Sequence, residues 1–175
     1  MNPNIRLILA SLLVMGGIAC THTVAPEEQT VSGDDDLLYS TSFESSQDTV
    51  GWPKYGEVSF SEDAPSGGGA RSIRISGGCI YPHAELDIRG PARDSYVKIE
   101  CWGKNLAIGG GLSLSRVDEP TGRISVSVTD SSWTYYRSAD SLFCPAGGTL
   151  RIEMGAGGIV FSAMLVDLVE VRVVR

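Results

Sequence analysis

Short runs of alternating apolar and polar residues cover the chain from Leu37 to its end, and no stretch there has the period of an amphipathic helix. Clusters of Gly, Pro, Ser and Asp, which favour turns, separate the runs. This pattern predicts strands over residues 37–44, 56–61, 70–76, 80–88, 96–104, 111–116, 123–129, 133–143, 149–155 and 163–174. Many short strands at regular spacing are typical of an all-β sandwich or barrel.

The clearest local unit is "LSLSRVDEPTGRISVSV", residues 112–128. Serines alternate with Leu, Ile and Val on both sides of "DEPTG", a stretch that favours a turn. The pattern predicts a hairpin with one apolar face and one face in contact with water.

The last predicted strand contains a carboxylate in an unexpected place. Counting by twos puts Asp167 in phase with Val169, Val171 and Val173. A buried carboxylate has to be paired, hydrogen-bonded or bound to a metal. One interpretation pairs Asp167 with Arg71 or Arg74 on a neighbouring strand, or makes it a cap for loop amides. The other makes it a metal ligand.

The first 19 residues differ from the rest of the chain. A basic start and an apolar core from Leu7 to Ile18 predict a secretory signal, too short for a membrane-spanning helix. The ending "GIAC" resembles the lipobox of bacterial lipoproteins, which implies cleavage before Cys20 and lipidation of that cysteine. The alternative is an ordinary signal peptide followed by an incidental cysteine.

Three segments follow from this pattern: a signal peptide over 1–19, a lipidated acidic tether over 20–36 and a folded domain over 37–175. Thr21 stands where an aspartate would mark inner-membrane retention in enteric bacteria, so we expect anchoring in the outer membrane of the cell envelope. The net charge is −7, whereas a nucleic-acid-binding protein needs a basic surface to bind phosphates, so nucleic acid is not an expected partner.

The domain contains three cysteines, so one disulfide would leave one cysteine over. Cys79 opens one predicted strand and Cys101 lies toward the end of the next, which favours a Cys79–Cys101 bond. Cys101–Cys144 is the alternative.

Several motifs follow one another in a characteristic order: "SFES", "GW", "SGGGARSIRI", "YVKIECWGK", "SSWTYY", "LFCPAGGTLRIEM" and "VDLVEVRV". This order resembles the galactose-binding-domain-like jelly roll, and in particular bacterial carbohydrate-binding modules of families four, nine and twenty-two. The resemblance implies a two-sheet antiparallel β-sandwich. It also implies that 70–76 lies beside the last strand, 96–104 beside 133–143, and 80–88 beside 149–155.

The same resemblance implies a structural calcium ion held by Glu44 and Asp167 together with backbone carbonyls of the 62–72 region. Calcium accepts six to eight oxygen ligands in irregular geometry, which suits such a set. A zinc site is not expected, because His83 is the only histidine of the domain. No organic cofactor is expected. Trp52 and Trp133 match positions that usually pack in the core.

Two surfaces are candidates for a glycan. The first is built from the polar phase of strand 80–88 and its neighbour, and comprises Tyr81, His83, Glu85, Asp87, Arg151 and Glu153. The second comprises Trp102 with Lys98 and Glu100. The alternative for both is that they are ordinary outward positions of a sheet with one wet face.

No catalytic constellation is apparent, because a nucleophile needs an adjacent base and the sequence lacks a nucleophile elbow. We therefore expect a non-enzyme. The leading hypothesis is a lipid-anchored, extracytoplasmic glycan-binding module. The alternative is a structural or adhesive envelope lipoprotein that binds a protein partner, and a small hydrolase is a weaker third hypothesis.

Overall fold

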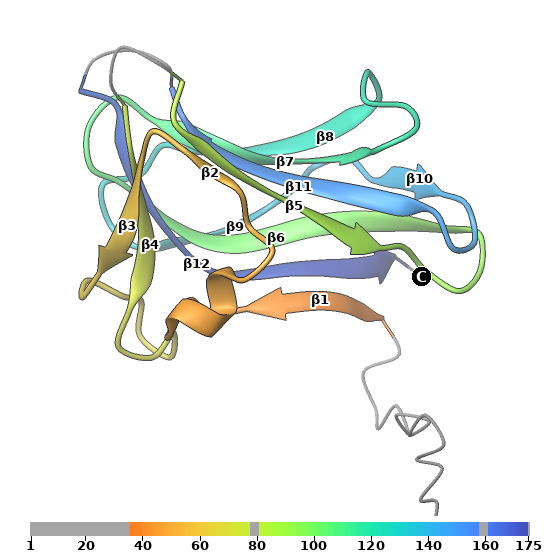
Figure 1. Cartoon of the computed structure of the whole chain (residues 1–175), viewed down its shortest axis with the longest axis horizontal. Helices are drawn as coiled ribbons and strands as arrows, with labels where there is room; N and C mark the ends of the chain where they lie inside the picture. Colours follow the sequence, from red (N-terminus) through yellow and green to blue (C-terminus); the bar gives the residue numbers. More distant parts are fainter. Residues whose placement is uncertain (1–35, 78–80, 158–160, 175) are drawn as a thin grey trace, which may run out of the picture. The chain divides into compact units, whose positions relative to one another are not determined.

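The computed structural model describes residues 36–77, 81–157 and 161–174, which form a sandwich of two antiparallel sheets (Figure 1). One short 3-10 helix, η1 (Ser46–Thr49), follows the first strand. The strands are β1 (Leu37–Thr41), β2 (Lys54–Tyr55), β3 (Glu57–Ser61), β4 (Ser72–Ser76), β5 (His83–Arg89), β6 (Ser95–Asn105), β7 (Gly110–Arg116), β8 (Arg123–Val128), β9 (Thr134–Arg137), β10 (Leu142–Cys144), β11 (Thr149–Ala156) and β12 (Ala163–Val174).

The two sheets have seven and five strands. The seven-stranded sheet has the order β10-β6-β12-β4-β3, with β1 also paired to β12 and β9 to β6. The five-stranded sheet has the order β2-β5-β11-β7-β8. The predicted pairings are confirmed: β4 pairs with β12, β6 with β9 and β10, and β5 with β11. The predicted all-β sandwich is therefore confirmed as well.

Two strand predictions needed correction. The predicted strand 133–143 is two strands, because the chain breaks at Ser138, whose hydroxyl donates to the Asp140 carbonyl oxygen at 2.9 Å. β2 was not predicted, because a strand of two residues shows no period.

The core lies between the sheets, where the apolar phase of each strand is buried. The 112–128 hairpin follows its prediction, with Leu112 and Leu114 buried on β7 and alternate residues buried along β8. Trp52 packs in the core with an edge-to-face contact on Phe43, at 5.9 Å between ring centroids. Trp133 does not belong to the core, contrary to expectation: it is half-buried, and its indole N–H donates to Asp63 Oδ1 at 2.8 Å.

The last strand contains a bulge at the position of the unexpected carboxylate. The register of β12 against β6 shifts between Asp167 and Glu170, and Leu168 has a φ of +47°. Before the bulge Val166 faces the core, and after it Val169 does. Asp167 is paired with Trp102, on the outward side of the sheet. The prediction that Asp167 shares the phase of the valines is therefore wrong, because the extra residue inverts the alternation.

Asp167 is nevertheless fully buried, with 0% of its surface exposed. The loop that follows β3 covers it, and a Cβ added at Gly68 of that loop would overlap Asp167 Oδ2. Asp63 holds the loop by accepting from Lys104 Nζ at 2.6 Å and from the Trp133 indole at 2.8 Å. Those hydrogen bonds lower the pKa of Asp63.

Cys101 and Cys144 are both buried and are not bonded to each other. Cys144 is paired with Ser95 at one end of β6, while Cys101 faces the core in the middle of that strand. The Cys101–Cys144 alternative is therefore wrong. Burial raises the pKa of the Cys101 thiol to about 12. Cys79 lies outside the described residues.

The predicted signal peptide, Cys20 and nearly all of the tether also lie outside the described residues. In the described ranges, none of the helical structure is long and apolar enough to span a lipid bilayer.

Candidate functional site

Three rows of side chains cross the outward face of the five-stranded sheet. Each row follows from the register of β2 on β5, β5 on β11, β11 on β7 and β7 on β8. The first row is Tyr55, His83, Gly155, Gly111 and Ser127; the second is Glu85, Glu153, Ser113 and Ser125; the third is Asp87, Arg151, Ser115 and Arg123. The face therefore changes from aromatic and charged residues on β2, β5 and β11 to glycine and serine on β7 and most of β8.

Tyr55, His83 and Tyr81 form a stack of three rings, here called the aromatic stack. The centroids of Tyr55 and His83 are 4.5 Å apart with an interplanar angle of 19°, and those of His83 and Tyr81 are 5.3 Å apart with an angle of 24°. Both tyrosines are 47% exposed. Tyr81 reaches over β11, as shown by Gly155, where an added Cβ would overlap the Tyr81 hydroxyl. The strand pattern did not point to Tyr55, because β2 itself was not predicted.

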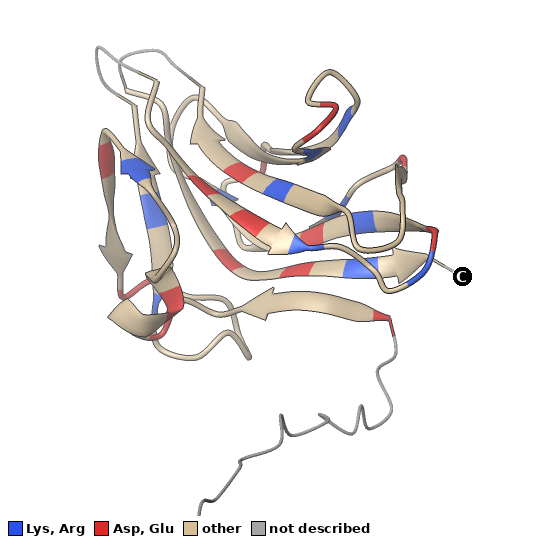
Figure 2. Ribbon diagram, turned by 45° about the vertical axis from the view of Figure 1, so that its right-hand side comes forward, with Lys and Arg blue, Asp and Glu red and all other residues tan. Residues whose placement is uncertain are grey.

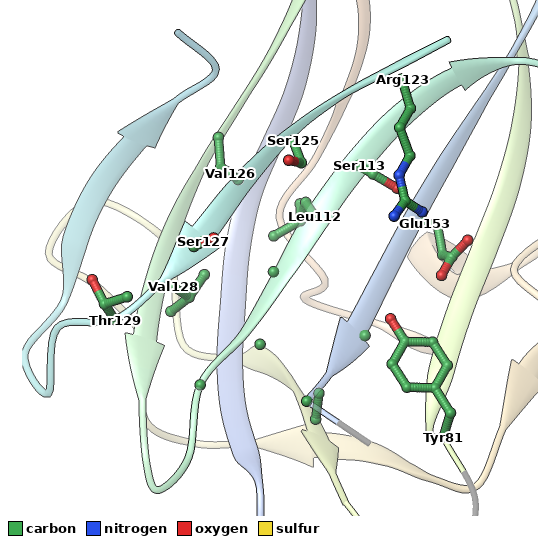
Figure 3. A pocket seen from close by; sticks show the side chains of 16 residues that line it. Tyr81, Leu112, Ser113, Arg123, Ser125, Val126, Ser127, Val128, Thr129 and Glu153 are labelled. Atoms are coloured by element: carbon green, nitrogen blue, oxygen red, sulfur yellow. The ribbon is translucent and has the colours of Figure 1, made fainter. Parts of the chain in front are cut away.

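A groove of about 430 Å³ lies beside the aromatic stack (Figure 3). Small residues of β7, β8 and β11 make up much of its lining, including Gly109–Gly111, Ser113, Ser125, Ser127 and Gly155–Gly157. The Tyr81 hydroxyl points toward Glu153, and the Arg123 side chain extends past Ser113 toward the same carboxylate (Figure 3). Burial and the Glu153 carboxylate raise the pKa of Tyr81. Within the described part of the chain, neither Arg123 nor Glu153 forms an ion pair.

The charged residues beside the groove are bound to one another. Arg151 holds both oxygens of Asp87, at 2.7 and 2.9 Å, and lies 3.7 Å from Glu85 Oε2. This bidentate pair lowers the pKa of Asp87 and raises that of Arg151. The structure thus brings Tyr81, His83, Glu85 and Arg151 to one face. Their role in ligand binding stays a prediction.

Trp102 and Glu100 lie elsewhere, on the outward face of the seven-stranded sheet. Glu100 is nearly buried; it pairs with Arg137 Nε at 2.8 Å and accepts from the Tyr135 hydroxyl at 2.6 Å. Burial and this hydrogen bond raise the pKa of Tyr135 to about 12. Figure 2 shows acidic and basic segments on neighbouring strands of the sandwich. The two predicted glycan surfaces therefore lie on different sheets. In the surface around Trp102, the Glu100 carboxylate is already bonded to Arg137 and Tyr135.

Asp167 forms no ion pair among the described residues, and one of its two oxygens has no hydrogen-bond partner there. Its Oδ1 accepts from the Leu168 amide at 2.8 Å, whereas its buried Oδ2 has no hydrogen-bond partner among the described residues. Burial raises its pKa to about 7, and the nearby Glu44 carboxylate adds to that shift. The predicted alternative partners lie elsewhere: Arg74 donates to Ser76 Oγ, and Arg71 lies over the Phe60 ring.

Glu44 approaches the same loop that covers Asp167. It accepts from the amides of Ala70 and Arg71 at 2.9 and 3.3 Å, and a Cβ at Gly69 would overlap its carboxylate. The described residues contain no cluster of three or more His, Cys, Asp or Glu side chains suited to a metal. Two carboxylates, one of which has an orphaned, buried oxygen, fit a hard cation, provided that backbone carbonyls or water supply the remaining ligands.

No protein-family model and no curated protein matches the sequence. Solved structures match its fold. The xylan-binding module CBM22-1 of Paenibacillus barcinonensis Xyn10C is 20% identical, with a TM-score of 0.56 over 82% of this chain and 98% of that one. A family 16 carbohydrate-binding module is 16% identical, with a TM-score of 0.54 over 70% and 91% of the two chains.

The CBM22-1-GH10 structure of Clostridium thermocellum Xyn10B, complexed with xylohexaose, is 15% identical, with a TM-score of 0.56 over 79% of this chain and 29% of that one. These identities are too low to show more than the fold. All three of these chains contain a carbohydrate-binding module. The chain has the jelly-roll sandwich fold of carbohydrate-binding modules.

Proposed function

We propose that this chain is a non-catalytic glycan-binding module that holds its ligand on the outward face of the five-stranded sheet. The observation that carries the proposal is the aromatic stack beside the groove of about 430 Å³. Aromatic rings offer flat apolar faces, and volumes of about 300–1,000 Å³ are typical of small-molecule sites. The xylan-binding module with the same fold supports the proposal.

The polar residues of the groove suit a ligand rich in hydroxyl groups. Glu153 and Arg123 are not engaged in ion pairs within the described ranges, and Ser113, Ser125 and Ser127 add neutral donors and acceptors. The Trp102 surface is less suitable, because the carboxylate of Glu100 is already bonded to Arg137 and Tyr135. Trp102 and Glu100 therefore take no part in the proposed site.

The proposal includes a structural calcium ion bound by Glu44 and Asp167. A bound divalent cation would supply the missing partner of Asp167 Oδ2 and would neutralise two neighbouring carboxylates. Its role would be to fix the covering loop, on the sheet opposite the groove.

The proposal also includes a lipid on Cys20 and a place in the outer membrane. The support is in the sequence alone: the signal pattern, the "GIAC" ending and the acidic stretch that follows it. A module that is anchored in this way would bind its glycan outside the cytoplasm.

Binding can be tested with the full chain in detergent micelles and a panel of xylan, mannan, galactan and mixed-linkage glucan. We expect at least one polysaccharide to retard the protein in affinity electrophoresis. Tyr81→Ala is expected to weaken that binding by roughly tenfold, which corresponds to about 1.4 kcal/mol. Tyr96→Ala is the matched control, because Tyr96 is 54% exposed and lies on the other sheet.

Two results would contradict the proposal. One is that none of the polysaccharides binds, and the other is that Tyr81→Ala and Tyr96→Ala bind equally well. Co-purification of an envelope protein without glycan binding would favour the alternative of a protein partner.

A further inference from the structure

The groove is closed on the side of the aromatic stack. In the first row the rings occupy the positions over β2, β5 and β11, because Tyr81 lies over Gly155. The groove begins beside the Tyr81 ring and continues over Gly111 on β7. His83 covers one face of the Tyr81 ring, so a ligand can pack only on the opposite face or against the hydroxyl. A ligand that extends across the strands is therefore stopped at Tyr81.

Along the strands, the groove is closed at one end. Arg123 and Glu153 reach toward each other beside Ser113 (Figure 3). Beyond them the third row carries the Arg151–Asp87 pair, in which both Asp87 oxygens accept from the Arg151 guanidinium. Because no ion pair in the described ranges involves Arg123 or Glu153, both can bond to ligand hydroxyls at this end.

The groove is open toward β8. This strand ends the five-stranded sheet and, among the strands that the structure describes, pairs with β7 alone; its outward residues at the groove are Ser125 and Ser127. These short side chains leave a way in from the sheet edge. The groove therefore has a stop on one side, charged groups at one end and an entrance over β8.

We infer that the groove binds the end unit of a glycan chain, with one sugar ring against Tyr81 and its hydroxyls held by Glu153 and Arg123. This inference rests on the proposed glycan-binding function and adds the mode of recognition. An internal unit is linked on both sides, so one of its neighbours would meet either the aromatic stack or the Arg123–Glu153 end. An end unit needs only one way out, either over β8 or past the small residues Gly109 and Gly157.

The test compares one linear polysaccharide before and after limited cleavage by an endo-hydrolase. Linear xylan is the probe if it binds, and otherwise the linear member of the panel that does. Cleavage multiplies chain ends at constant mass. We expect the number of binding sites per gram, measured by titration calorimetry with the full chain, to rise in proportion to the ends. The corresponding free monosaccharide is expected to compete.

The outcomes separate this inference from the proposed function. If binding depends on Tyr81 but the number of sites per gram stays constant or falls, recognition is internal; the inference is then wrong and the proposed function stands. If no glycan binds, or if Tyr81→Ala leaves binding unchanged, both the inference and the proposed function are wrong.

Two phenylalanine substitutions test the geometry directly. Ser127→Phe places a ring inside the groove, whereas Ser115→Phe places the same ring on the same face, in the row of Arg123 and outside the groove. We expect Ser127→Phe to weaken binding at least tenfold and Ser115→Phe to change it less than twofold, with both variants folded by circular dichroism. A loss with Ser115→Phe would show that the glycan extends along β7 past Arg123, against the inference.

Discussion

Asp167 is a carboxylate that the fold buries completely while one of its oxygens has no hydrogen-bond partner among the described residues. Such a group is costly when it is ionised, and the cost appears as a pKa of about 7. A cation between Asp167 and Glu44 would remove this cost. The residue therefore predicts how stability should respond to both pH and calcium.

Without a bound cation, folded Asp167 stays protonated up to about pH 7, whereas in the unfolded chain it ionises near pH 4. Over this window the folded state holds the extra proton, so the free energy of unfolding falls as pH rises, by about 1.4 kcal/mol per unit. Asp167→Asn is expected to remove this slope. Urea unfolding between pH 4.5 and 7.5 in EDTA measures it, with Asp140→Asn, at an exposed loop position, as the control. Equal slopes in wild type and Asp167→Asn would contradict the assignment.

Bound calcium should offset the loss of stability that comes from burying the ionised Asp167 carboxylate. We expect millimolar calcium chloride at pH 7.5 to raise the Tm of the wild-type chain by several degrees, because a ligand that binds only the folded state stabilises it. Asp167→Asn, which removes a charged ligand, should show little or no rise. Thermal melts with calcium and with EDTA measure the difference. A wild-type Tm that is the same in calcium and in EDTA would rule out a stabilising calcium ion.

Gly155 is important for the position of Tyr81, because the Tyr81 hydroxyl occupies the space that a side chain at residue 155 would fill. Gly155→Ala is expected to displace the Tyr81 hydroxyl, the movable end of a side chain, so stability should change little while glycan affinity falls several-fold. Gly122→Ala is the matched control, since the atom nearest to its added Cβ is 3.9 Å away. Calorimetric titration of both variants, with Tm as the check on folding, distinguishes them. Unchanged affinity in Gly155→Ala would show that Tyr81 has no contact with the ligand.

At the scale of elements, the bulge in β12 decides where Asp167 points. Leu168 adopts a φ of +47° to form it, a region that L-residues other than Asn, Asp and Gly seldom adopt. The inserted residue shifts the alternation of β12 by one position, which turns Asp167 toward the covering loop. The metal site thus depends on the bulge as well as on the two carboxylates.

A β-branched residue should be poorly tolerated at this bulge. We expect Leu168→Val to lower the free energy of unfolding by about 1–2 kcal/mol more than Leu142→Val does, because Leu142 is also half-buried but lies in the regular strand β10. Urea unfolding compares the two. Equal losses would mean that the backbone at Leu168 carries no strain.

Sequence alternation located the strands well because each long strand buries one face. It failed where the period is absent or broken. β2 has only two residues, so Tyr55 was missed, and the bulge inverted the phase assigned to Asp167. The prediction that Glu44 and Asp167 lie near one loop came from the family resemblance, because local periodicity carries no information about contacts between distant residues. The structure does place both side chains against the loop at residues 68–70. The groove was missed for another reason: alternation marked Ser113, Ser125 and Ser127 as outward, but small outward residues do not by themselves indicate a hollow.

At the scale of the whole molecule, the two faces of the sandwich have separate tasks in our proposal. The groove lies on the five-stranded sheet, and the Glu44–Asp167 site lies on the outward side of the seven-stranded one. Variants of one site should therefore leave the other intact, in keeping with the additivity of distant changes.

The anchoring proposal is also tested at this scale. We expect Cys20→Ser to abolish incorporation of radiolabelled fatty acid in a Gram-negative host and to move the protein from the membrane fraction to the soluble one. Cys144→Ser, at a buried position within the domain, is the control and should remain membrane-bound. A wild-type chain that takes up no label would favour the ordinary signal peptide.

The pairing of β1 with β12 has a mechanical consequence. β1 is the first strand after the acidic segment, and it runs antiparallel to β12 along Leu37–Thr41. A pull along the tether would load these hydrogen bonds together, in shear, instead of opening them one by one. At the far end of β1, Glu44 is fastened to the loop amides of Ala70 and Arg71. A module held by lipid at one end and by a glycan at the other would carry tension through its first strand. A calcium ion bound by Glu44 and Asp167 would then tie the end of this strand to β12.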